Sequence, residues 1–219
     1  METLGKIIPM KLIFWNVDTQ IDFVEPSGKL YVEGAETIKP TLEKLTKLAY
    51  EKSIVVVNTA DFHHSSSAEL SANPDFKTTF PPHCMAGTEG AAFISETFPE
   101  VPLIVDWDEY YDTASLEFGV KNSRNIVIRK DAFDVFAGNG YTEQILKIIA
   151  PETVVVYGVT TNVCVNDAVV GLAARGKKVI VISDAIKELP NLPLPFEYWN
   201  QLGIGMITID ELEKMLNQI

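Results

Sequence analysis

The stretch Thr153–Gly171, TVVVYGVTTNVCVNDAVVG, constrains the fold of this chain more than any other. It begins with an uncharged β-branched run, Val154–Tyr157, which is typical of a strand buried on both faces. Gly158 breaks this run, and apolar residues then recur at helical spacing over Val163–Arg175. A buried strand that leads directly into a helix is the repeating unit of α/β proteins, so the stretch predicts that class.

Cys164 lies in the first turn of the predicted helix, after the N-cap candidates Thr161 and Asn162. Free backbone N–H groups and the helix dipole favour negative charge there, so a thiol can be held partly as thiolate. Taken alone, a cysteine between two valines is explained more simply by burial, because free cysteine is among the most buried residue types. Cys164 is therefore a candidate nucleophile whose role depends on the residues that reach the same place.

Length and composition predict one globular domain, residues 1–219, with ample material for a core. The formal net charge of −12, with no basic run to offset it, argues against binding to nucleic acid or to an anionic membrane. Lys6 and Lys11 interrupt the first apolar runs, which makes a poor signal peptide, and no run approaches the roughly 20 apolar residues of a membrane span. Two cysteines are too few for a disulfide framework, so we expect a cytoplasmic protein.

The alternation of strands and helices predicts a three-layer α/β/α domain with a mostly parallel, doubly wound sheet of about six strands. The expected strands are Leu12–Val17, Ile54–Asn58, Ile126–Arg129, Val154–Tyr157, Val179–Ser183 and Ile204–Ile209. Further helices are expected over Glu36–Lys52 and Tyr141–Ala150, and from a cap at Asp210 to Gln218. The Pro-rich segments Ser65–Pro102 and Pro190–Pro195 are expected to be irregular.

Titratable residues follow four of the expected strands: Asp18, Asp61 with His63, Lys130 and Cys164. Ligands bind beyond the carboxyl ends of parallel strands, so these residues are expected at one edge of the sheet. A thiol, a carboxylate and an ammonium group suit acyl transfer, with Cys164 as nucleophile, Asp18 moving its proton and Lys130 favouring the thiolate. Each residue also has a simpler interpretation, because Asp18 could close a turn and Lys130 could be a solvated lysine.

Asp61 and His63 are also candidate metal ligands, because alternate residues of an extended segment point to the same side. His83 follows after Pro81-Pro82, whereas His64 points away from His63 and is interpreted as a surface histidine. Two imidazoles and one carboxylate suit zinc, iron or manganese. Spacing alone leaves open whether a metal is bound.

Four motifs together resemble the nicotinamidase branch of the isochorismatase-like cysteine hydrolases. In chain order they are VDTQIDF at 17–23, DFH at 61–63 with FPPHCMAGTEGAAF at 80–93, Arg129-Lys130 followed by Phe133 and Phe136, and GVTTNVCV at 158–165. The motifs occur in the family's order and cover most of the chain. The Asp-x-His pair and the Pro-Pro-His-Cys setting distinguish nicotinamidases from metal-free relatives.

This resemblance implies an amidohydrolase that converts nicotinamide to nicotinic acid and ammonia through a thioester. It implies that Cys164 attacks the carboxamide carbon and that Asp18 and Lys130 complete a catalytic triad. A cis peptide bond between Val159 and Thr160 would place the N–H groups of Thr160 and Cys164 in the oxyanion hole.

The resemblance further implies one divalent metal ion, with zinc favoured over iron or manganese, held by Asp61, His63 and His83. Many members carry a fourth ligand, often histidine, at the position of Glu69. Glu69 is therefore a candidate ligand, with water as the alternative.

Phe23, Phe80 and Val159 are the expected pocket residues, with Phe80 in place of the family's usual tryptophan. The two phenylalanines are also consistent with ordinary core aromatics. The sequence departs from the family around Lys130, where DVF replaces the expected pattern, and in the short Pro-rich segment Leu189–Pro195. These departures leave the substrate open.

The expected partner is a small-molecule amide, and a homo-oligomer is compatible with the resemblance. The alternative activity is hydrolysis of another small amide, a carbamoyl compound or an enol ether. A non-catalytic binding protein that kept the fold is a third hypothesis, and it would have an unreactive Cys164.

Overall fold

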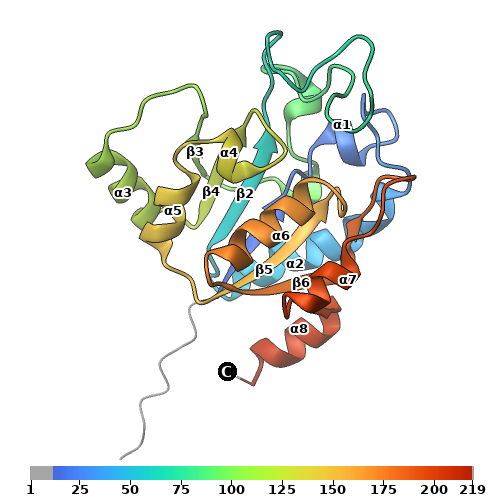
Figure 1. Ribbon diagram of the computed structural model, residues 1–219. Helices are drawn as coiled ribbons and strands as arrows, with labels where there is room; N and C mark the ends of the chain where they lie inside the picture. Colours follow the sequence, from blue (N-terminus) through green and yellow to red (C-terminus); the bar gives the residue numbers. More distant parts are fainter. Residues whose placement is uncertain (1–11, 219) are drawn as a thin grey trace, which may run out of the picture.

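The computed structural model describes residues 12–218, in which seven strands form one parallel sheet in the order β3-β4-β2-β1-β5-β6-β7 (Figure 1). The strands are β1 (Leu12–Val17), β2 (Val56–Asp61), β3 (Leu103–Val105), β4 (Asn125–Lys130), β5 (Thr153–Val159), β6 (Lys178–Lys187) and β7 (Gly205–Ile207). From β1 the chain winds first toward β2 and β4 and later toward β5 and β6. This reversal confirms the doubly wound α/β architecture and places the topological switch point at β1.

Helices cover both faces of the sheet (Figure 1). One face packs against α1 (Ile21–Val24), α2 (Lys39–Glu51) and α8 (Ile209–Leu216). The other face packs against α3 (Thr113–Asn122), α4 (Val135–Gly138), α5 (Thr142–Ile149), α6 (Cys164–Ala174) and α7 (Phe196–Gln201). Short 3-10 turns occupy Ala35–Ile38, Glu89–Ala91 and Ser95–Thr97. Within the described residues, no helix combines the length and apolar character needed to cross a bilayer.

The central strands divide the core into two layers because successive side chains point to opposite faces. In β1, Phe14 packs in the layer under α2, whereas Ile13 and Trp15 pack in the layer under α6. All seven residues of β5 are buried, which confirms the prediction from the β-branched run. Pro40 is accommodated in the first turn of α2, where its missing N–H has no helical partner.

The sequence prediction missed five elements, the strand β3 and the helices α1, α3, α4 and α7. With only three residues, β3 is too short to display a periodic pattern, and it accounts for the difference between six and seven strands. It forms because Leu103 and Val105 lie alongside Ile126 and Ile128 of β4, a long-range pairing that no local pattern reveals.

Three predicted boundaries were wrong. Gly158 does not end β5, because the strand continues through it to Val159 with a register irregularity against β6. Neither Thr161 nor Asn162 caps α6, whose N-cap is Val163 without a side-chain hydrogen bond. The C-terminal helix is capped by Thr208, which forms a capping box with Glu211, rather than by Asp210.

The Gly158→Ala substitution tests the close approach of β5 to β1, where Gly158 lies opposite Val17. Gly158 has φ 122°, and an added Cβ would lie 2.0 Å from the carbonyl oxygen of Val17. We expect the free energy of unfolding in urea to fall by more than about 2 kcal/mol. Gly176→Ala is the matched control, because Gly176 also has positive φ but an added Cβ would meet no atom within 4 Å. Its expected cost is about 1 kcal/mol, and equal losses for the two variants would contradict this account.

Candidate active site

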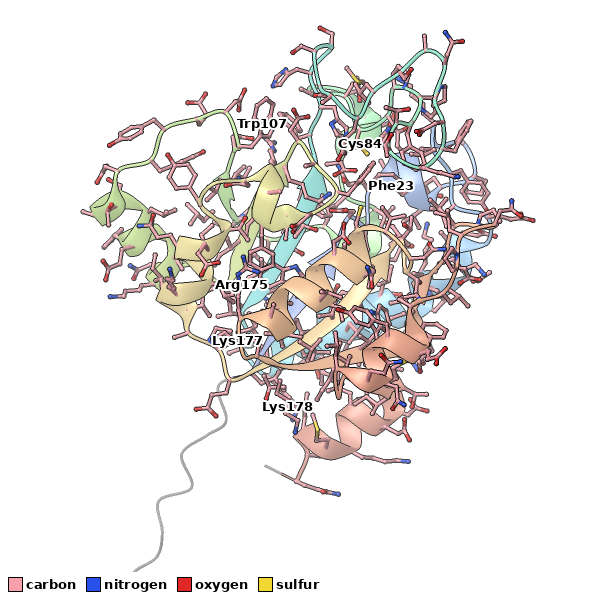
Figure 2. The ribbon with its side chains drawn as sticks, viewed as in Figure 1. Phe23, Cys84, Trp107, Arg175, Lys177 and Lys178 are labelled. Atoms are coloured by element: carbon pink, nitrogen blue, oxygen red, sulfur yellow. The ribbon has the colours of Figure 1, made fainter. Side chains whose placement is uncertain are left out.

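The carboxyl ends of four adjacent strands, in the order β4-β2-β1-β5, carry the candidate site. Lys130 ends β4, Asp61 ends β2, Asp18 follows β1, and Cys164 follows β5 as the first residue of α6. All four side chains are at least 94% buried. The predicted convergence of these residues at one sheet edge is therefore present. Figure 2 shows Phe23 and Cys84 at this end of the sheet, while Lys177 and Lys178 lie at the opposite end.

Lys130 lies at the centre of this cluster. Its Nζ is 3.0 Å from Asp18 Oδ2 and 3.8 Å from Cys164 Sγ, and it also donates a hydrogen bond to Asp61 Oδ1. One ammonium group thus contacts two carboxylates and the thiol. Such a buried charge is tolerated because opposite charges compensate for its lost hydration.

The pKa shifts in this cluster follow from burial and from Lys130. Burial opposes the charge of Lys130, but Asp18 and Asp61 raise its pKa well above the usual value. Burial raises the pKa of Asp18 more than Lys130 lowers it. Burial also raises the pKa of the Cys164 thiol well above its usual value, against the attraction of Lys130. Burial therefore favours the neutral thiol of Cys164, which lies within 4.8 Å of the Asp18 carboxyl group.

Backbone and side-chain contacts fix the position of Asp18. Asp18 adopts φ 47°, which turns the chain sharply after β1. The Thr59 hydroxyl donates to Asp18 Oδ1 over 2.6 Å, and the Asp18 N–H donates to the carbonyl of Thr59 over 3.2 Å. Asp18 thus closes a turn, as the simpler interpretation holds, and also contacts the lysine. The two interpretations are compatible.

The turn between β5 and α6 begins with a cis peptide bond between Val159 and Thr160, as expected from the family resemblance. The carbonyl of Thr160 accepts from the N–H groups of Val163 and Val165, each over 3.1 Å, and these bonds close the turn. Within residues 12–218, the N–H groups of Thr160 and Cys164 have no acceptor. Both donors are therefore available to an oxygen atom near the thiol.

Asp61, His63 and His83 form a second, adjoining group whose potential ligand atoms all lie within 4.8 Å of one another. Asp61 Oδ2 is 3.7 Å from His63 Nε2 and 3.6 Å from His83 Nε2. His63 Nε2 is buried without a hydrogen-bond partner among the described residues. Three convergent donors and an orphaned ring nitrogen fit a divalent metal ion.

The outer nitrogens of both rings are held by other groups. His63 Nδ1 lies 2.8 Å from Asp131 Oδ1, and His83 Nδ1 lies 2.8 Å from the carbonyl oxygen of Pro81. In each ring this leaves Nε2 directed toward Asp61, the arrangement that orients histidine ligands in metal sites. The sequence analysis missed Asp131, although its position next to Lys130 placed it at the same sheet edge.

Glu69 lies beside this group but is not one of its three members. Its Oε1 accepts a hydrogen bond from the Phe133 N–H over 2.8 Å, while Oε2 is buried and has no partner within residues 12–218. Burial raises the pKa of Glu69 to about 7. Its role as a fourth ligand stays a prediction.

A small cavity of about 20 Å³ opens onto the thiol. Its walls are largely apolar, formed by Phe23, Leu30, Asp61, Phe80, His83, Phe133, Thr160, Val163, Cys164 and Leu189. Phe23 and Phe80 are thus placed as expected, whereas the Val159 side chain lies in the core layer under α2. Leu30 and Leu189 come from irregular connections that carry no local signal, so the sequence analysis did not identify them.

The Asp131→Asn substitution tests the outer contact of His63. We expect the dissociation constant for zinc to rise about 10- to 100-fold, because the amide orients His63 less strongly than the carboxylate does. Isothermal titration with a competing chelator measures this constant without reference to activity. The matched control is Asp108→Asn, which removes a carboxylate from the exposed His64 and should leave zinc affinity unchanged. An unchanged affinity in Asp131→Asn would show that this contact does not support metal binding.

Comparisons with known proteins agree with this geometry. Residues 115–193 match the isochorismatase domain family. The nicotinamidase/pyrazinamidase of Mycobacterium tuberculosis is 38% identical over 77 residues, a segment covering 35% of this chain and 40% of that protein. The segment that matches the isochorismatase domain includes Lys130 and Cys164, so that similarity extends to part of the site.

Solved structures share the fold over nearly the whole chain. The zinc complex of Pyrococcus horikoshii pyrazinamidase aligns with a TM-score of 0.70 and 23% identity, over 91% of this chain and 99% of that one. The N-carbamoylsarcosine amidase of Thermoplasma acidophilum aligns with a TM-score of 0.70 and 22% identity, over 91% of this chain and 96% of that one. An isochorismatase-like hydrolase of Alkaliphilus metalliredigens aligns with a TM-score of 0.71 and 26% identity, over 94% of this chain and 99% of that one. Residues 115–193 of this chain are thus similar to the isochorismatase domain, and the fold of the described chain is similar to that of an isochorismatase-like hydrolase.

Proposed function

We propose that this chain is a metal-assisted cysteine amidohydrolase that converts nicotinamide to nicotinic acid and ammonia. One observation carries the proposal: Lys130 contacts Cys164, Asp18 and Asp61 at once, and Cys164 and Asp61 line a largely apolar pocket. A candidate nucleophile, proton carrier and metal ligand thereby lie close enough together to act on the carbonyl group of one substrate. The similarity to nicotinamidases adds support.

In the first half of the reaction Asp18 accepts the proton of Cys164, and the sulfur attacks the carboxamide carbon. Lys130 stabilises the thiolate that forms. The N–H groups of Thr160 and Cys164 donate to the oxyanion of the tetrahedral intermediate. Asp18 then returns the proton to the departing nitrogen, ammonia leaves, and a thioester remains on Cys164.

In the second half a water molecule attacks the thioester carbon while Asp18 accepts its proton. The same two N–H groups stabilise the second oxyanion. The carbon–sulfur bond breaks, the carboxylic acid is released, and Cys164 regains its proton. Each step uses a carboxyl group whose pKa burial has raised, and such a group is a stronger base than an exposed aspartate.

Asp61, His63 and His83 would hold the divalent metal ion, with zinc as the first candidate and iron or manganese as alternatives. When bound, such an ion supplies a Lewis-acid contact for the ring nitrogen of the substrate. Asp61 divides its two oxygens between Lys130 and the histidine pair, so it joins the metal group to the catalytic cluster.

The pocket lining favours an uncharged aromatic amide over a carbamoyl amino acid. Among its described lining residues there is no lysine or arginine to pair with a substrate carboxylate. Phe23, Phe80 and Phe133 instead offer aromatic surfaces to a flat ring. N-carbamoylsarcosine is the second candidate substrate, because an amidase with that name has the same fold. Self-association into a homo-oligomer stays a prediction.

The Cys164→Ala substitution tests the nucleophile. We expect ammonia release from nicotinamide by metal-loaded protein to fall by roughly 10⁴-fold or more, because no thioester can form. Cys84→Ala is the matched control, since Cys84 is also buried and lies in the family motif but does not contact Lys130. It should retain most of the activity.

The same assay, run over a panel of small amides with metal supplied or chelated, tests the substrate. Nicotinamide should be hydrolysed faster than N-carbamoylsarcosine, and chelation should slow the reaction. Absence of ammonia release from nicotinamide by the metal-loaded parent protein would refute the proposal.

The pH dependence of kcat/KM tests the role of Asp18. Because Asp18 must be ionised to accept the thiol proton, activity should fall as pH drops through its pKa, which burial raises above 3.8. Thr59→Val removes a hydrogen bond that favours the carboxylate, so the acid limb should move to higher pH. Thr153→Val is the matched control, because the buried Thr153 hydroxyl has no partner among the described residues. A Thr59→Val profile that coincides with the parent profile would argue against Asp18 as the base.

A further inference from the structure

Two cavities meet at the candidate active site. The inner cavity, at Cys164, measures about 20 Å³, and an outer cavity of about 590 Å³ lies beyond it. Leu30, Phe80 and Leu189 line both cavities. These three apolar side chains therefore separate the thiol from the outer cavity.

The inner cavity is too small for any aromatic amide. A volume of about 10–15 Å³ on this measure accommodates one water molecule, and a ring that carries a carboxamide is many times larger. For such a substrate to reach Cys164, at least one of the three separating side chains must move outward.

Leu30 and Phe80 are held by backbone hydrogen bonds within their own segments. The Leu30 N–H donates to the Asp22 carbonyl over 3.1 Å. The Phe80 N–H donates to the Glu69 carbonyl over 2.8 Å, and the Phe80 ring packs edge-on against Phe133. Displacement of the backbone at either residue would break these hydrogen bonds.

Leu189 is held differently. It lies near the start of the irregular connection between β6 and α7, and within the described chain residues 189–194 make no backbone–backbone hydrogen bond. Their hydrogen bonds all involve the side chain of Asn162. Its Oδ1 accepts from the Leu189 N–H over 3.0 Å, and its Nδ2 donates to the carbonyls of Leu189 and Leu192 over 2.9 and 3.2 Å.

Asn162 stands two positions before Cys164, in the turn between the cis peptide bond and α6. We propose that Leu189–Leu192 is the gate of the active-site pocket and that Asn162 is the positioning residue that holds this gate closed over the nucleophile. The inference rests on the proposed function in one respect: the molecule admitted is the amide substrate. Because the side chain of Leu189 and its neighbours Leu30 and Phe80 are apolar, the open gate admits uncharged rings.

The test measures how fast Cys164 is alkylated by a small reagent, iodoacetamide, and by a bulkier one, N-ethylmaleimide. Peptide mass spectrometry separates Cys164 from Cys84. In Asn162→Ala we expect the N-ethylmaleimide rate to rise about ten-fold, with a smaller change for iodoacetamide, because the open gate matters more to the bulkier reagent. Asn166→Ala is the matched control: Asn166 is a helix α6 residue that bonds Trp199 rather than the gate. It should react at the parent rate.

Leu189→Ala keeps the test decisive if Asn162→Ala folds poorly. Asn162 bonds backbone atoms of Leu189 and Leu192, so this variant shortens the gate side chain and leaves the hydrogen bonds of Asn162 intact. It too should speed modification by N-ethylmaleimide. Parent-like rates in both variants, or an equal increase in Asn166→Ala, would overturn the gate. Because alkylation does not require amide hydrolysis, that result is distinguishable from a failure of the proposed function.

Discussion

The buried ammonium group of Lys130 is the interaction on which the rest of this site depends. Its side chain is 1% exposed, and an unpaired charge there would cost several kcal/mol. Asp18 and Asp61 approach it from β1 and β2, and the thiol of Cys164 completes its surroundings. The charge pairs that make a buried lysine tolerable are the same contacts that place a candidate base and a candidate nucleophile together. Stability and chemistry therefore impose the same geometry at this sheet edge.

Asp61 joins the Lys130 cluster to the candidate metal ligands, because its two oxygens face different groups. Oδ1 accepts from Lys130, whereas Oδ2 faces the Nε2 atoms of His63 and His83. Burial opposes its ionisation, but Lys130 and the histidines hold its pKa well below the usual range. Gln20 further fixes Asp61 by bonding both its N–H and its carbonyl, each over 2.8 Å. A shift of this residue would disturb the metal group and the catalytic cluster together.

The shared fold and the pocket lining give different information about function. Amidases with different names share this fold at TM-scores of 0.70, so the fold alone does not select a substrate. Selection depends on the side chains that surround the thiol, and several of them come from irregular segments. Leu30 follows α1, and Leu189 follows β6. Such loops vary without disturbing the sheet, so the pocket lining can differ between proteins that share this fold.

The sequence by itself determined the α/β class, the central strands and the residues at their carboxyl ends, because buried parallel strands leave strong apolar runs and the residue after each run must lie at the sheet edge. It did not predict β3 or the cap at Val163, where pairing across the fold outweighs local preference. Only the tertiary structure showed Asp131 against His63 and Asn162 against Leu189. Contacts between residues distant in the chain depend on how strands and loops pack, and no local pattern encodes that packing.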